Sequence, residues 1–184
     1  MKVLNVGGGA SRYLPPHFDG WEQVLLDADP DCKPDICCDA KDIQNHVEQG
    51  TYDAVYCSHA LEHFYAHDVP LVLKGMLYAM SPSVGELRTS KIEIHVPNLR
   101  NLMQTMLQSN LDINDVWYRA GDNPITFHDV LYGWSAAMGK GNLFYAHKCG
   151  FTRLSLQTAL EKAGFSGVQV QEQGANLMAR ATCQ

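Results

Sequence analysis

Short apolar runs, separated by glycine, proline and polar residues, recur along the chain. Several are rich in β-branched and aromatic residues, and most stop at a turn-forming residue, which together predict β-strands. The run from residue 91 to 96 also alternates polar and apolar side chains and ends at Pro97. We expect seven strands, at residues 2–6, 22–27, 35–38, 52–57, 91–96, 167–171 and 176–181.

Apolar residues spaced three and four apart predict helices between several of these strands. They share one helical face over residues 69–80, 99–107 and 156–163, and Gly164 follows the last segment in a C-cap position. Strands that alternate with helices are typical of a parallel sheet. The pattern therefore predicts an α/β fold with a doubly wound, mostly parallel sheet.

Two segments depart from this alternation. Residues 11–21 contain Pro15-Pro16, which disfavours a long crossover helix, so at most one short helical turn is expected there. Residues 110–150 have mixed polarity and many aromatic side chains, and we expect them to form an insertion over the open end of the sheet. No composition break or repeat divides the chain, so residues 1–184 are expected to form a single domain.

Composition narrows the function classes. The 184 residues are 46% hydrophobic and carry a formal net charge of -6 without any basic run, so a nucleic-acid partner is not expected. No apolar stretch is long enough to span a bilayer or to act as a signal peptide, which favours a cytoplasmic protein with no membrane partner. The six cysteines are interpreted as free thiols.

Small and polar residues follow the first four strands in order. Glycines occupy residues 7–9, Asp27 ends the second strand, Asp39-Ala40 follow the third, and Ser58-His59 follow the fourth. All four positions lie at the carboxyl ends of predicted parallel strands, where open α/β sheets bind ligands. Glycines let a backbone approach a ligand closely, and an acidic residue after the second strand can bind ribose hydroxyls, with Asp29 as an alternative to Asp27.

These residues resemble the class I S-adenosylmethionine-dependent methyltransferases, most closely the methyltransferase type 11 group. Leu61-Glu62-His63, after the strand that contains Tyr52-Asp53-Ala54-Val55, is the most specific part of the resemblance. Apart from the insertion, the resemblance covers nearly the whole chain. It rests on residues 4–9, 26–27, 35–40, 52–64, 96–99, 147–152 and 160–165.

The resemblance implies a Rossmann-like, seven-stranded sheet whose last strand is antiparallel, and an enzyme that transfers the methyl group of S-adenosylmethionine. It implies that the glycine loop contacts the methionine part of the cofactor, Asp27 the ribose and Asp39 the adenine. Two residues depart from the family pattern: Asn5 replaces a common acidic residue, and Ser11 a common third glycine. The predicted cofactor-binding residues are Asn5, Gly7, Gly8, Gly9, Asp27, Asp39, Ala40, Ser58 and His59.

The acceptor is expected to be a small molecule bound under the insertion, whose aromatic side chains can stack on a ring or a sugar. The same aromatic residues also fit a local minicore or a homodimer contact, so these alternatives stay open. Histidine is a common general base for methyl transfer to a hydroxyl or ammonium group. The candidate catalytic residues are His59, His128 and His147.

Two other functions compete with methyl transfer. His59-Ala60-Leu61-Glu62-His63 fits the H-x-x-E-H pattern of a zinc hydrolase, with Glu62 as general base. The pattern begins directly after a strand rather than inside a long helix, so no metal is expected. A non-catalytic cofactor-binding protein is the other alternative, and Asn5 and Ser11 favour it slightly.

Overall fold

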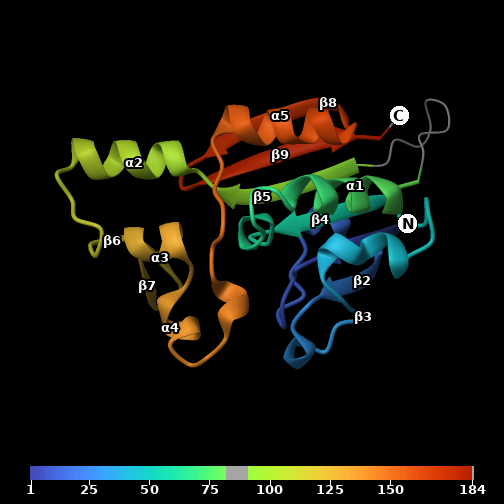
Figure 1. The fold of residues 1–184 in the computed structure, drawn as a ribbon, viewed down its shortest axis with the longest axis horizontal. Helices are drawn as coiled ribbons and strands as arrows, with labels where there is room; N and C mark the ends of the chain where they lie inside the picture. The colour runs from blue at the N-terminus through green and yellow to red at the C-terminus, as the bar shows by residue number, and fades with distance from the viewer. Residues whose placement is uncertain (82–90, 184) are drawn as a thin grey trace.

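A seven-stranded sheet forms the centre of the computed structural model, which describes residues 1–81 and 91–183 (Figure 1). The strand order is β3-β2-β1-β4-β5-β9-β8. β1 to β5 pair in parallel, and β9 is antiparallel to both of its neighbours, which confirms the predicted sheet. The strands are β1 (Lys2–Val6), β2 (Glu22–Asp27), β3 (Ile36–Cys37), β4 (Ala54–Ser58), β5 (Lys91–Pro97), β8 (Ser166–Gln173) and β9 (Asn176–Thr182).

Two predicted helices cover one face of this sheet, α1 (Val69–Ala79) and α5 (Arg153–Ala163) (Figure 1). The main hydrophobic cluster joins their apolar faces to alternate residues of the strands, because successive side chains of a strand point to opposite faces. α5 begins at a capping box formed by Thr152 and Ser155 and ends at Gly164, which has φ 105°.

The other face has no long helix between β1 and β2. The chain there forms one 3₁₀ turn, η1 (Pro16–Phe18), as Pro15-Pro16 led us to expect. Phe18 fills part of the space that a crossover helix would occupy. Its ring centroid lies 5.2 Å from that of Trp21 and 5.9 Å from that of Tyr56 on β4.

The remaining short connections are also 3₁₀ turns: η2 (Pro30–Cys32), η3 (Ala40–Asn45) and η4 (Leu61–His63). These turns are too short to show a hydrophobic period, so the sequence does not predict them. Two aspartates cap them. The Asp29 side chain accepts a hydrogen bond from the backbone N–H of Asp31, and the Asp39 side chain accepts one from that of Lys41.

After β5 come the predicted helix α2 (Leu99–Gln108) and the insertion, which lies beyond the carboxyl ends of the parallel strands (Figure 1). Part of its aromatic content forms a minicore, in which Leu102 of α2 packs with Phe127 and Trp117. In the described part of the chain, no helix is long and apolar enough to cross a membrane. The insertion contains β6 (Val116–Ala120), β7 (Asn123–Thr126), α3 (Phe127–Tyr132), α4 (Ser135–Met138) and η6 (Leu143–Tyr145).

Candidate functional site

A cavity of about 240 Å³ opens where the parallel strands end. It is lined on the strand side by six of the residues that the sequence analysis proposed as cofactor ligands. The convergence follows from the topology, because the carboxyl ends of parallel strands meet at one edge of the sheet. These six residues are Gly7, Gly9, Asp27, Asp39, Ala40 and His59.

The glycine loop after β1 needs its glycines for two separate reasons. Gly7 and Gly9 have φ values of 70° and 58°, a region that other residues rarely adopt. A Cβ atom on Gly7 would lie 2.4 Å from the Cβ atom of Ala60, whereas one on Gly9 would meet no atom within 4 Å. Gly7 therefore allows close packing of the backbone, and Gly9 leaves the cavity open.

Asp27 fixes this loop to the end of β2. One carboxylate oxygen accepts a hydrogen bond of 3.0 Å from the N–H of Gly9, and the other accepts one of 3.0 Å from the N–H of Asp29. Asp29, the alternative ribose ligand, also lines the cavity. Its Oδ2 accepts a hydrogen bond of 3.0 Å from Asn142 of the insertion, so the two sides of the cavity are connected at this point.

Three of the proposed cofactor residues do not line the cavity. Asn5 is fully buried, and its Nδ2 donates to the carbonyl of Tyr13 at 3.3 Å. Gly8 lies directly over it, so a Cβ atom there would come within 2.4 Å of Asn5 Nδ2. The side chain of Ser58 hydrogen-bonds Tyr56. These three residues therefore pack within the loop and the strand ends rather than facing the cavity.

His59 is held at the end of β4 in an unusual backbone conformation, with φ 51°. Its Nδ1 lies 3.3 Å from Oε1 of Glu62, whose side chain is 1% exposed. Burial lowers the pKa of His59, but the neighbouring Glu62 outweighs this effect, so the pKa is raised overall. Burial raises the pKa of Glu62, and the surrounding histidines His59, His63 and His147 outweigh it, so that pKa is lowered.

His63 and His147 complete a group of imidazoles around Glu62. The two rings lie 4.9 Å apart, edge to face. His63 contacts the carbonyl oxygens of Ala146 and His59, and His147 Nδ1 contacts that of Val130 at 2.9 Å. Burial lowers the pKa of His147. No sequence pattern indicated that His147, in the insertion, meets Glu62 beside β4.

Potential ligand atoms of Glu62, His63 and His147 lie within 4.8 Å of one another, a grouping that could hold a metal ion. It differs from the H-x-x-E-H arrangement, which needs both histidines on one face of an α-helix. Here η4 is a 3₁₀ turn that contains only Leu61–His63, and His59 precedes it in a left-handed conformation. The arrangement required for a zinc hydrolase is therefore not formed.

His128, the third proposed catalytic residue, lies on α3 of the insertion. Its ring centroid is 5.0 Å from that of Tyr132, and His128 is not among the residues that line the cavity.

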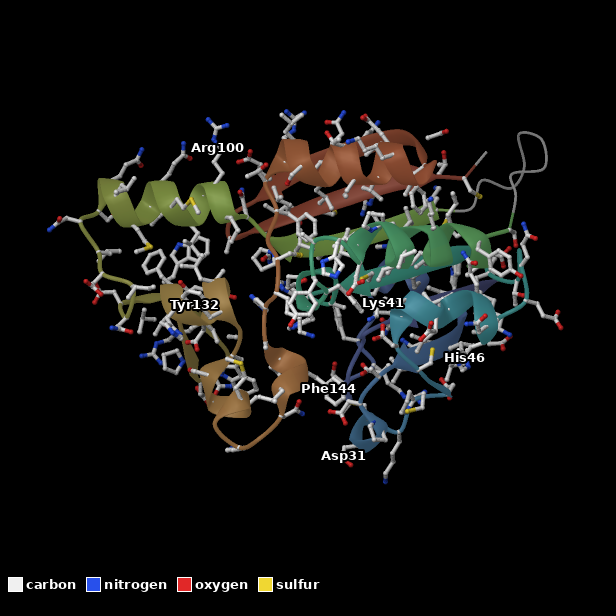
Figure 2. The ribbon with its side chains drawn as sticks, viewed as in Figure 1. Asp31, Lys41, His46, Arg100, Tyr132 and Phe144 are labelled. Carbon is white, nitrogen blue, oxygen red and sulfur yellow. The ribbon has the colours of Figure 1, made fainter. Side chains whose placement is uncertain are left out.

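The insertion supplies an aromatic wall of the cavity through Phe144 and Tyr145, opposite Tyr65 on the strand side. Figure 2 shows Phe144 directed from the insertion towards the segment that carries Asp31. Lys148 also lines the cavity, and its Nζ lies 5.4 Å from the centroid of the Tyr65 ring. This part of the site was expected only as a general aromatic cover, without assigned residues.

No protein-family model and no curated protein sequence matches the chain. Solved structures do match it. A methyltransferase from Archaeoglobus fulgidus, described as dependent on S-adenosylmethionine, has 15% identity and a TM-score of 0.62, over 98% of this chain and 85% of that one. A possible histamine N-methyltransferase from Thermotoga maritima has 13% identity and a TM-score of 0.60, over 100% of this chain and 82% of that one.

Human N-acetylserotonin methyltransferase, solved in complex with S-adenosylmethionine, has 13% identity and a TM-score of 0.58. The match covers 99% of this chain and 47% of the human chain. At these identities the comparisons establish the fold, and the strand order agrees with it. The chain therefore has the fold of the class I S-adenosylmethionine-dependent methyltransferases, as the sequence resemblance implied.

Proposed function

We propose that the protein is an S-adenosylmethionine-dependent methyltransferase that acts on a small molecule. The observation that carries this proposal is the cavity at the carboxyl ends of β1, β2, β3 and β4, where Gly9, Asp27, Asp39 and His59 converge. In open α/β sheets this edge is the usual ligand site.

The residues of the cavity fit such a cofactor. A Cβ atom at Gly9 would project into empty space, which is the room that a ligand needs beside the loop. Asp27 keeps acceptor capacity for ribose hydroxyls, since each carboxylate oxygen has two lone pairs. Asp39 and Ala40, after β3, line the part of the cavity assigned to adenine. When bound, S-adenosylmethionine supplies an electrophilic methyl group.

His59 lines the same cavity as Phe144 and Tyr145 of the insertion, and we assign these three residues to the acceptor. The aromatic side chains supply flat apolar surface, which suits a ring-containing acceptor. His59 is the best-placed catalytic candidate because it lines the cavity, whereas His147 contacts the network behind it.

Cytoplasmic location and self-association stay predictions. Cell fractionation tests the first, and analytical ultracentrifugation tests the second.

Titration calorimetry with S-adenosylmethionine and its demethylated product tests the cofactor assignment. We expect both to bind, and Asp27→Asn to weaken binding by about 1–3 kcal/mol, the scale of hydrogen bonds to a charged group. Asp31→Asn is the matched control, because Asp31 is exposed near the same loop and does not line the cavity. Absence of binding at millimolar concentration would contradict the proposal.

A further inference from the structure

Glu62 has an unusual environment for a carboxylate. It is buried, with a relative exposure of 1%, and neither oxygen receives a well-aligned hydrogen bond from the described residues, although His59 Nδ1 lies 3.3 Å from Oε1. A buried charge without such partners is costly unless opposite charge lies close by. The groups that surround it are three imidazoles, those of His59, His63 and His147.

Contacts with two backbone carbonyl groups hold His63 beside Glu62. His63 Nδ1 is 3.1 Å from the carbonyl oxygen of Ala146, and its Nε2 is 3.0 Å from that of His59. A carbonyl oxygen only accepts a hydrogen bond, so a ring nitrogen that bonds to it is the donor. These contacts connect the ring to the insertion at Ala146 and to the end of β4 at His59.

The carbonyl contacts of His63 disfavour a metal ion at this position. Each ring nitrogen of His63 already lies within hydrogen-bond distance of a carbonyl oxygen. Glu62 and His147 alone would remain from the three-residue group, fewer ligands than protein metal sites ordinarily supply. A metal ion would require His63 to lose one of its two carbonyl contacts.

His59 is the member of this group that reaches the cavity. Its Nδ1 faces Glu62 at 3.3 Å, so the carboxylate favours the tautomer with hydrogen on Nδ1 and a free lone pair on Nε2. Nε2 lies on the opposite edge of the ring from this contact. The side chain of His59 is 43% exposed and lines the cavity, while Glu62 lies behind it.

We propose that Glu62 is a positioning residue that holds His59 as the general base of the transferase, and that the acceptor is a hydroxyl compound. This inference rests on the proposed function. The acceptor hydroxyl gives its proton to Nε2 of His59, and its oxygen forms a bond to the transferred methyl carbon. The methyl–sulfur bond breaks and its electron pair remains on sulfur.

A base at this position favours a hydroxyl acceptor over a neutral amine. A neutral hydroxyl is a weak nucleophile that gains from proton removal during attack, whereas a neutral amine attacks through its free lone pair. The left-handed conformation of His59 is further support, because such backbone strain persists at sites where the surrounding structure imposes it.

Nuclear magnetic resonance of the histidine side chains tests the pairing in protein saturated with S-adenosylhomocysteine, without any acceptor. The ionisable groups that face Glu62 in this network are His59, His63, His147, Cys57, Cys149 and Tyr118. We expect the pKa of His59 to fall in Glu62→Gln and to stay unchanged in the exposed control Glu161→Gln. An unchanged pKa in Glu62→Gln would overturn the pairing.

The acceptor class is tested with matched phenol and aniline probes, by measuring formation of S-adenosylhomocysteine. We expect turnover of phenols and a loss in kcat of about 100-fold in His59→Asn, the scale of general base catalysis. Asparagine tolerates the left-handed conformation at this position, which guards against misfolding. The control His46→Asn changes an exposed histidine of the η3 end, labelled in Figure 2, and should leave turnover unchanged.

The pH profile separates a base from a structural residue. Phenol turnover should rise with pH as His59 loses its proton, and the rise should move to lower pH in Glu62→Gln with little change in KM. Faster turnover of anilines, absence of phenol turnover, or stoichiometric binding of added zinc that is lost in Glu62→Gln would overturn this inference. Failure of calorimetry to detect cofactor binding would instead reject the proposed function.

Discussion

Gly133 lies where two segments of the insertion meet. Its φ is 103°, and a Cβ atom there would lie 1.9 Å from the carbonyl oxygen of Tyr145. A β-bridge joins Gly133 to Ala146, so the residue connects α3 to the segment that carries His147. Gly133 therefore has a packing role between these two segments.

Gly133→Ala should therefore destabilise the insertion by more than about 1 kcal/mol, because both φ and the close contact oppose a side chain. At a compatible position the same change stabilises a protein, by at most about 1 kcal/mol. Thermal unfolding measures the effect. Gly139→Ala is the control, since Gly139 has a helical φ of -63°. Equal stability of the two variants would show that the backbone moves away without cost.

Some residues of the site were predictable from the sequence, and others were not. Asp27, Asp39 and His59 were predictable because each ends a strand, and parallel strands bring their ends together. Asn142 and His147 were not assigned their contacts, because these depend on the path of the insertion. That path is set by contacts between residues far apart in the chain, such as Asn142 with Asp29.

Among the elements of the insertion, α3 and α4 are connected through one carboxylate. Asp129 accepts hydrogen bonds from the backbone and hydroxyl groups of Thr126, at the start of α3, and of Ser135, at the start of α4. Burial raises the pKa of Asp129, but these hydrogen bonds outweigh it and lower the pKa to about 2. Such a carboxylate stabilises the folded protein only while it is ionised.

The sign of the pH effect follows. The folded pKa lies below the unfolded value of about 3.9, so the contribution is complete above that value and is lost as pH falls towards 2. In chemical denaturation, the stability difference between wild type and Asp129→Asn should shrink by about 1 kcal/mol between about pH 6 and about pH 3. A stability difference that stays constant with pH would mean that ionisation of Asp129 does not stabilise the folded protein.

A second link at this scale joins η6 to the β2 side of the cavity. Asn142 Oδ1 accepts a hydrogen bond from the N–H of Phe144, while its Nδ2 donates to Asp29. Asn142→Asp keeps the acceptor but places two carboxylates together. We expect faster hydrogen exchange at residues 142–147 in Asn142→Asp, and slower exchange there when S-adenosylhomocysteine and a phenol bind the wild type.

Asn114 is an exposed residue of the same insertion, so Asn114→Asp controls for the added charge. Unchanged exchange in Asn142→Asp, together with unchanged exchange on ligand binding, would show that this part of the insertion is a fixed wall rather than a moving cover.

At the level of whole elements, the long helices and most strands were predictable, since burial of one face produces a regular apolar period. The 3₁₀ turns after β2, β3 and β4 and the β6–β7 hairpin were not, because local capping and the minicore around Phe127 determine them. The connection at Pro15-Pro16 was predictable, since prolines exclude a long helix whatever the rest of the fold, and only one 3₁₀ turn forms there.

For the whole molecule, the proposed cofactor would contact the carboxyl ends of several strands at once. A ligand that binds only the folded state stabilises it by about 2.7 kcal/mol at a concentration of 100 times its Kd. S-adenosylhomocysteine at that concentration should therefore raise Tm by about 5 °C or more in a scanning calorimeter. Homocysteine, which lacks the adenosine part of the ligand, is the control and should leave Tm unchanged. An equal rise in Tm with both compounds would contradict specific binding.

The position of β9 has a consequence for how the chain reaches this fold. β9 lies between β5 and β8, so β8 joins the sheet only through it. The β8–β9 hairpin, closed near Gly174, is local, but pairing Lys91 with Thr182 closes a long loop. Loops of that length slow folding. Until the hairpin docks, β5 has an unpaired edge and carries the apolar residues Ile92 and Ile94. Refolding at high protein concentration should therefore favour aggregation through that edge.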